Sequence, residues 1–175
     1  MRASIAVAFL LAAVSAYGQG GGPPLPDRMP PPRWQAFRSY DGKFSFEMPG
    51  QPAYKSQTLK AKNDHPVSYA TYTVDLGKVA YMVSTSDYDE ETHISLDGAI
   101  EGVMSSWEKP RNVERKSTRL LGYPAQTVDL LSDRYHVIVH AIVVGKRLYQ
   151  LGFVEEIDEY LPAHASRFMK SLRLR

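Results

Sequence analysis

Apolar and polar side chains alternate along much of this chain, as they do in β-strands that bury one face. Early in this pattern Phe44, Phe46 and Met48 alternate with polar residues. Pro49 and Gly50 then interrupt the alternation with a turn signal. We therefore predict a strand, a turn and a second strand in this region.

Longer strand-like runs follow in both halves of the chain. Residues 67–76 and 79–85 are rich in β-branched and aromatic side chains and flank Gly77, which predicts a β-hairpin. Residues 135–144 are apolar on both faces, as in a central strand, and residues 148–154 are expected to pair back onto them. Strands joined by such short turns predict a mostly antiparallel sheet.

Two segments have apolar residues at helical spacing instead. Ser95 is the predicted N-cap of the first helix, and a second helix is predicted from about Glu159. The apolar positions of the first are Leu96, Ile100, Val103, Met104 and Trp107. Those of the second are Leu161, Ala165, Phe168, Met169 and Leu172. The predicted fold class is α+β, a mostly antiparallel sheet flanked by two amphipathic helices.

A basic stretch lies after the first helix. Its cationic residues are Lys109, Arg111, Arg115, Lys116 and Arg119. Glutamates interrupt them and no aromatic platform is interleaved, so we interpret the stretch as a charged edge strand that resists aggregation. The whole chain has a formal charge of +2, which is too small to indicate a nucleic acid or an anionic membrane as partner.

The chain begins with the features of an export signal. Arg2 precedes an apolar run over residues 5–14 that ends in small side chains. We predict a signal peptide over residues 1–16, cleaved after Ala16, although cleavage after Gly18 satisfies the same small-residue rule. The run is about half of the roughly 20 residues that span a bilayer, so no membrane span is expected after cleavage. The protein is therefore expected to be exported, to a periplasm or to the medium.

A glycine- and proline-rich segment separates the signal from the folded part. Residues 17–35 are predicted to be a disordered linker, and residues 36–175 a single α+β domain. A proline-rich segment can be a ligand for an aromatic groove, but a spacer is the favoured interpretation.

Several classes of site are missing from the sequence. The chain has no cysteine, which excludes a disulfide, a thiolate zinc site and a cysteine nucleophile. It also lacks the Gly-x-Ser-x-Gly elbow, a phosphate loop and the dinucleotide-binding Gly-x-Gly-x-x-Gly. The sequence therefore nominates no catalytic residue and no cofactor, and it favours a protein that is not an enzyme.

The best metal candidates are four side chains in one loop, Asp87, Asp89, Glu91 and His93. Hard cations favour clustered carboxylates, but the spacing does not match that of an EF-hand calcium loop. A solvated acidic loop before a helix N-terminus is the favoured interpretation.

Two other histidines, His136 and His140, lie four residues apart on a predicted strand. Their separation along it is about 13 Å, which is too far to share one ion. We interpret them as ordinary sheet histidines.

Tyrosines are frequent in the predicted strands: Tyr69, Tyr72, Tyr81, Tyr135 and Tyr149. Most are expected to pack on a half-buried face. If several instead point from an uncovered face of the sheet, they would form a binding patch. The sequence leaves these two alternatives open.

Four segments, residues 40–49, 121–125, 147–151 and 168–172, together resemble the PsbP/Mog-like domains. Residues 40–49 are similar to the opening strand and residues 121–125 to the turn into the second half of the sheet. Residues 147–151 and 168–172 are similar to a later strand and the closing helix. The resemblance implies a central antiparallel sheet covered by helices, used in the known members for docking and assembly more than for catalysis.

The leading hypothesis is a non-catalytic exported domain that binds an envelope or secreted protein. The alternative is a domain that binds a small ligand or a divalent metal, and an enzyme with an unrecognised site is least favoured.

Overall fold

The computed structural model describes residues 33–60, 65–107 and 109–175. The predicted signal peptide, its cleavage after Ala16 and the predicted linker up to residue 32 lie outside these residues. Within the described part, no helix combines the length and the apolar character needed to cross a bilayer.

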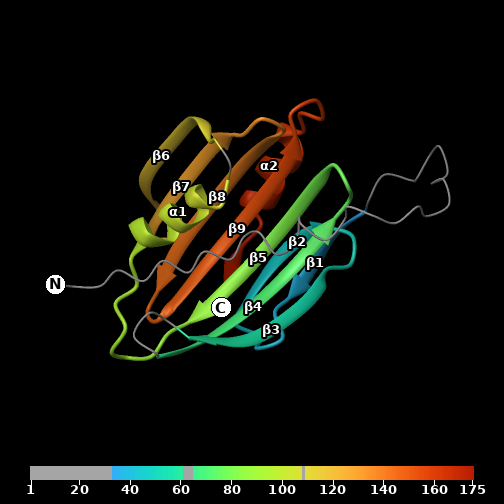
Figure 1. Ribbon diagram of the computed structural model, residues 1–175. Coiled ribbons are helices and arrows are strands. Elements are labelled where there is room, and N and C mark those ends of the chain that lie inside the picture. The colour runs from blue at the N-terminus through green and yellow to red at the C-terminus, as the bar shows by residue number, and fades with distance from the viewer. Residues whose placement is uncertain (1–32, 61–64, 108) are drawn as a thin grey trace.

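One large antiparallel sheet forms the centre of the described structure (Figure 1). Its strand order is β3-β4-β5-β9-β8-β7-β6, and the strands predicted over residues 67–76, 79–85, 135–144 and 148–154 belong to it, whereas the strand predicted around Phe46 does not. The bounds are β3 (Ala53–Lys60), β4 (Pro66–Asp75), β5 (Val79–Asp87), β6 (Arg111–Leu120), β7 (Tyr123–Leu131), β8 (Tyr135–Val144) and β9 (Arg147–Glu156).

A second, three-stranded sheet has the order β1-β2-β10. Its strands are β1 (Trp34–Arg38), β2 (Phe44–Pro49) and β10 (Arg173–Leu174). The sequence predicted one sheet, because pairing of β2 with a strand from the other end of the domain leaves no local pattern. Strand β1 also begins two residues before the predicted domain start at residue 36, since the Trp34 ring packs edge-on against Tyr81, 5.6 Å between centroids.

The two helices are α1 (Leu96–Ser105) and α2 (Pro162–Met169). The predicted N-cap of α1 is confirmed, because the Ser95 side chain accepts a hydrogen bond from the N–H of Gly98. Helix α2 begins later than the predicted Glu159. Tyr160 has a positive φ of 30°, which breaks the helical path, and Pro162 is suited to the first helical turn.

The two faces of the large sheet pack against different layers. Helix α1 lies on one face, in front of the sheet in Figure 1, and packs on β7 and β8. The other face packs on the three-stranded sheet and α2, which together we call the covering layer. Buried aromatic rings join this layer to the sheet: Phe44, Phe46, Tyr81, Phe153 and Phe168. Burial of each contributes on the order of 2 kcal/mol of hydrophobic free energy.

The covering layer stops before the strands beneath it do. Strand β4 presents Tyr72 to this layer but Ala70 and Ser68 beyond it, and on β5 the side chain changes from Val83 to Thr85. Register pairs Tyr72 with Val83 and Ala70 with Thr85, so these side chains share one face. The change from apolar to small and hydroxyl-bearing residues marks where the face opens to solvent.

Candidate functional site

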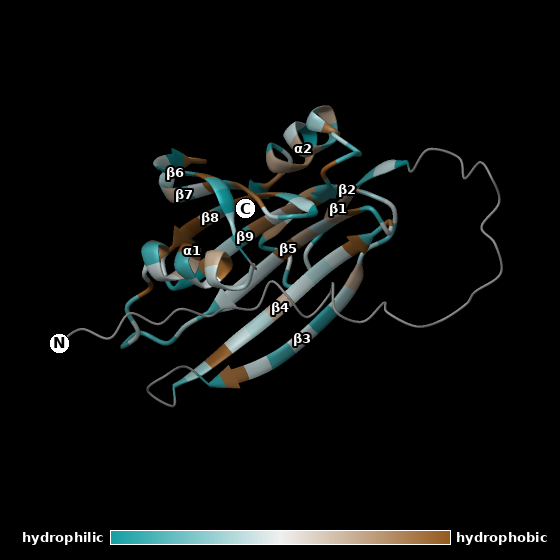
Figure 2. Cartoon of the chain, turned by 45° about the horizontal axis from the view of Figure 1, so that its top comes forward, coloured by the Kyte–Doolittle hydropathy of each residue, from teal (hydrophilic) through white to brown (hydrophobic). Residues whose placement is uncertain are grey.

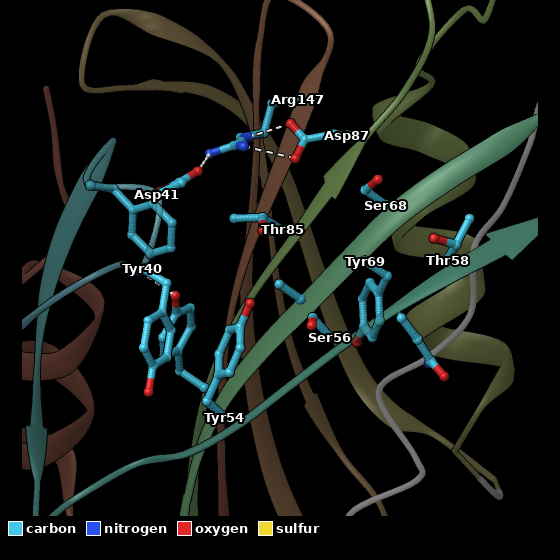
Figure 3. Close-up of a pocket in the computed structure, with 14 residues that line it drawn as sticks. Tyr40, Asp41, Tyr54, Ser56, Thr58, Ser68, Tyr69, Thr85, Asp87 and Arg147 are labelled. Carbon is cyan, nitrogen blue, oxygen red and sulfur yellow. Dashed lines mark hydrogen bonds and ion pairs between the residues drawn. The ribbon is translucent and has the colours of Figure 1, made fainter.

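A cavity of about 500 Å³ occupies the open part of this face, and we call it the tyrosine groove (Figure 3). It is lined by residues from β3, β4 and β5, by the start of β9 and by the turn between β1 and β2. The lining residues are Tyr40, Asp41, Phe44, Tyr54, Ser56, Gln57, Thr58, Ser68, Tyr69, Ala70, Tyr72, Thr85, Asp87 and Arg147.

Three tyrosines from three elements gather at one side of the groove. The ring centroids of Tyr40 and Tyr54 are 4.3 Å apart, and that of Tyr72 lies 5.0 Å from Tyr54. Tyr72 is buried and its hydroxyl accepts a 2.9 Å hydrogen bond from the backbone N–H of Tyr40. Tyr40 itself is 77% exposed and Tyr54 39%, so two aromatic rings face solvent on a buried support.

The turn that carries Tyr40 is fixed by its own hydrogen bonds. The N–H of Gly42 donates to the carbonyl of Ser39 at 2.9 Å, and Gly42 has φ +70°, which favours glycine. The Asp41 carboxylate accepts from the Ser39 hydroxyl at 2.7 Å and from the N–H of Lys43 at 3.1 Å. The exposed ring of Tyr40 therefore projects from a well-defined backbone.

The other side of the groove is an ionic group that we call the arginine cluster, made of Arg147, Asp41 and Asp87. Arg147 donates two bonds to Asp87, at 2.5 and 2.7 Å, and a third to Asp41 at 2.5 Å. The Arg147 side chain is only 11% exposed, while those of Asp41 and Asp87 are 36% and 40% exposed. One cation between two carboxylates leaves one negative charge in excess at this side.

Two groups of the arginine cluster, Asp41 and Arg147, have pKa values shifted so that they keep their charges over the ordinary pH range. Burial raises the pKa of Asp41, but the hydrogen bonds that its carboxylate accepts outweigh burial and lower the pKa from 3.8 to about 2. Burial lowers the pKa of Arg147, and its carboxylate partners raise it further than burial lowers it. Asp41 and Arg147 therefore both stay charged at neutral pH.

Hydroxyl groups occupy the remaining lining, from Ser56 and Thr58 on β3, Ser68 on β4 and Thr85 on β5 (Figure 3). Hydroxyls can both donate and accept hydrogen bonds, so this surface suits a polar ligand. Among the lining residues there is no histidine, and both carboxylates are held by Arg147. The groove therefore has the arrangement of a binding surface, with aromatic rings at one side and charge at the other.

Comparison with known proteins bears on the fold. No protein-family model matches the sequence, and no curated protein matches it. The solution structure of the cyanobacterial PsbP (CyanoP) from Synechocystis sp. PCC 6803 superposes with a TM-score of 0.56, over 91% of this chain and 99% of that one, at 11% identity. The chain has a PsbP-like fold. The resemblance stated from the sequence is confirmed at the level of the fold.

The PsbP-like fold does not bring the four metal candidates together. Asp87 belongs to the arginine cluster, and His93 is exposed. Asp89 instead bonds to the Nδ1 atom of His65, whose Nε2 atom lies 3.9 Å from Glu91. Residues 33–60, 65–107 and 109–175 contain no group of three His, Cys, Asp or Glu residues placed to hold a metal ion.

The pKa values in this acidic loop respond to the pairing. Hydrogen bonds from Thr92 and His65 lower the pKa of Asp89, and the bond to Asp89 raises the pKa of His65. Asp89 of the loop is thus paired with His65, which lies directly before β4, at the surface of the domain.

His136, interpreted above as an ordinary sheet histidine, is the centre of a second ionic group, the histidine cluster. Its ring nitrogens lie 2.8 Å from Glu155 and 2.8 Å from Asp129. Glu155 is 1% exposed and also accepts a 2.6 Å bond from the N–H of Leu161, at the start of α2. Burial lowers the pKa of His136, but the two carboxylates outweigh burial and raise it above 6.5.

His140 lacks such neighbours to offset burial, and burial lowers its pKa. The two histidines lie on one strand, but their pKa values are shifted in opposite directions. The cross-strand register, which places Glu155 directly opposite His136, was the signal that could have shown the cluster.

The strand tyrosines are mostly packing residues, as predicted. Tyr69, Tyr72, Tyr81 and Tyr149 are buried. The tyrosines that face solvent were not on the predicted list, because Tyr40 lies in a turn and Tyr54 on an edge strand whose tyrosine gave no distinct signal.

The basic stretch is an edge strand, as predicted. Strand β6 is the last in the sheet order and its residues are almost all exposed. Arg115 pairs with Asp97 of α1, and Lys116 with its strand neighbour Glu114 at 2.6 Å. Arg115 and Lys116 are therefore paired with carboxylates of the same domain.

Proposed function

We propose that this chain is an exported, PsbP-like accessory domain that binds another protein of the cell envelope or the medium through the tyrosine groove. Export is supported by the signal-like residues 1–16 at the start of the sequence. The accessory role is supported by the fold analogy and by the lack of a catalytic motif in the sequence.

The exposed ring of Tyr40 carries this proposal. A large aromatic side chain that is 77% exposed has lost the hydrophobic free energy that burial would provide. Its backbone is nevertheless held by the buried hydroxyl of Tyr72, so the ring is presented in a defined position. Rigid tyrosines that lose little entropy on contact are typical anchors of protein interfaces.

The rest of the groove fits a protein surface as well. The arginine cluster gives one excess negative charge beside the rings, and this charge favours a basic group of the partner. The rings of Tyr40 and Tyr54 can also receive a lysine or arginine by cation–π contact. We therefore expect the contacting segment of the partner to carry a basic residue.

The proposal is tested by a crosslinked pull-down from the envelope and medium of the host, with tagged mature chain that begins at Tyr17. We expect one reproducible partner that is captured by the wild type. The double variant Tyr40→Ala and Tyr54→Ala should reduce its capture at least about tenfold, since two interface anchors are removed.

Tyr160→Ala is the matched control, because Tyr160 is 71% exposed but lies before α2, outside the groove. This variant should capture as much partner as the wild type. Equal capture by the groove variant, or no enrichment above a tag-only sample, contradicts the proposal.

A further inference from the structure

Among residues 33–60, 65–107 and 109–175, no strand lies beyond the outer edge of β3. Strand β3 is the first in the sheet order and pairs only with β4 among the described strands (Figures 1 and 2). Seven of its eight residues are exposed, and Leu59 is partly buried. An edge strand of this kind leaves a row of backbone N–H and C=O groups available for pairing.

The other edge of the same sheet is protected and β3 is not. Strand β6 has five charged side chains in ten residues and a register shift between Arg111 and Glu114, which are devices that prevent strand addition. Strand β3 pairs with β4 without a shift from Ala53 to Lys60 and has only two charged residues. The contrast indicates that pairing is prevented at β6 and permitted at β3.

We propose that two copies of this chain pair through β3, antiparallel and across a two-fold axis, into one continuous sheet. In the pairing centred on Gln57, Tyr54 faces Lys60 of the second copy and Ser56 faces Thr58. These are an aromatic–cation pair and a hydroxyl pair, both favourable across strands. A pairing centred on Lys55 would place two lysines opposite each other, which is unfavourable.

The occupant is a second copy because the strand is complementary to itself. A two-fold pairing brings the same surface of both copies together, which is the commonest form of association among oligomers. The axis is perpendicular to the sheet, so both tyrosine grooves face the same side. This pairing is made by the backbone edge of β3. Because Tyr54, Ser56, Gln57 and Thr58 also line the tyrosine groove, it is tested by crosslinking between copies and not by capture of the groove's partner.

The absence of cysteine allows a direct test on the mature chain. Gln57→Cys places one thiol on the proposed axis, where facing residues have Cα atoms about 4.5–5.5 Å apart, within disulfide range. Mild oxidation should convert this variant into a covalent dimer on a non-reducing gel. Lys55→Cys, whose two copies would lie about 13 Å apart along the strands, and Lys116→Cys on β6 should stay monomeric.

The mass in solution provides a second readout that needs no new thiol. Light scattering should show a dimer for the wild type, and Gln57→Lys, which sets two charges opposite each other, should weaken dimerisation about fivefold. A wild type that is monomeric at every concentration overturns the proposal. So does equal crosslinking of all three cysteine variants, or a monomer whose β3 edge takes up an extended peptide instead.

Discussion

The arginine cluster and the histidine cluster are built alike and lie at opposite ends of β9. Arg147 is the first residue of that strand, and Glu155 is next to its last. Each cluster sets one basic group between two carboxylates on the face beneath the covering layer. Each also contacts that layer. Arg147 bonds to Asp41 in the β1–β2 turn, and Glu155 accepts a hydrogen bond from the N–H of Leu161 at the start of α2.

The two clusters differ in burial and in how they titrate. The carboxylates around Arg147 are more than one-third exposed, whereas Glu155 is fully buried. Arginine keeps its charge at any ordinary pH, and histidine is charged only below its pKa. The same arrangement therefore gives a permanent link at one end of the covering layer and a pH-dependent link at the other.

Loss of the buried carboxylate should have the largest effect. Glu155→Ala leaves the Nδ1 atom of His136 and the N–H of Leu161 without their carboxylate partner in a buried site. We expect the free energy of unfolding, measured by urea denaturation, to fall by about 3 kcal/mol.

The neighbouring Glu156 is the matched control. It pairs at 2.9 Å with Arg134, whose side chain is 70% exposed, and Glu156→Ala should cost less than about 1 kcal/mol. Equal losses for the two glutamates would remove the distinction between a buried link and a surface pair.

A smaller loss is expected at the arginine cluster. In Arg147→Lys a single ammonium cannot reproduce the paired bonds to Asp87 together with the bond to Asp41. Because both carboxylates are partly exposed and screened, we expect a loss of about 1.5 kcal/mol at neutral pH. Arg134→Lys at the surface should change the free energy of unfolding by less than about 0.5 kcal/mol, and a similar value for Arg147→Lys would contradict the role of the cluster.

The smallest expected effect is the pH dependence of the free energy of unfolding, which should differ between the histidine cluster and the arginine cluster. The pKa of His136 is raised above 6.5 in the folded state, so its contribution to stability is fully present below pH 6.5 and is lost as the pH rises through the folded pKa. Asp41 behaves in the opposite sense, because its pKa is lowered to about 2, and its contribution is lost only as the pH falls from about 4 toward 2.

Urea unfolding of His136→Gln from pH 5 to pH 9 tests this expectation. The variant should lose most stability relative to the wild type at the acid end of that range. His140→Gln is the control. Because burial lowers the pKa of His140, the loss of stability with rising pH should persist in this variant. If the loss of stability that the wild type shows with rising pH also occurs in His136→Gln, another group causes it.

The local part of the fold was predictable from the sequence. The β-branched and aromatic residues over 67–76 and the apolar run over 135–144 predicted strands, and Ser95 predicted the start of α1, because these signals depend on neighbouring residues alone. The three-stranded sheet was not predictable, since Ser45 of β2 pairs with Arg173 across most of the domain.

The two ionic clusters and the tyrosine groove depend more than the local elements do on the register between paired strands. The sequence grouped Asp87 with the acidic loop, but it lies directly opposite Arg147 when β5 pairs with β9, two strands that are not consecutive in the chain. The groove was missed for the same reason, because Tyr40, Tyr54 and Tyr72 come together only through the fold.

The covering layer also has a consequence for how the domain folds. Most neighbours in the large sheet follow one another in the chain and can form hairpins early, at little loop-closure cost. The covering layer joins distant segments, as in the bond from the N–H of Glu47 to Ser171, 124 residues later. We expect this closure to come late in folding. Until it is complete, the aromatic face of the sheet is uncovered and exposed to aggregation.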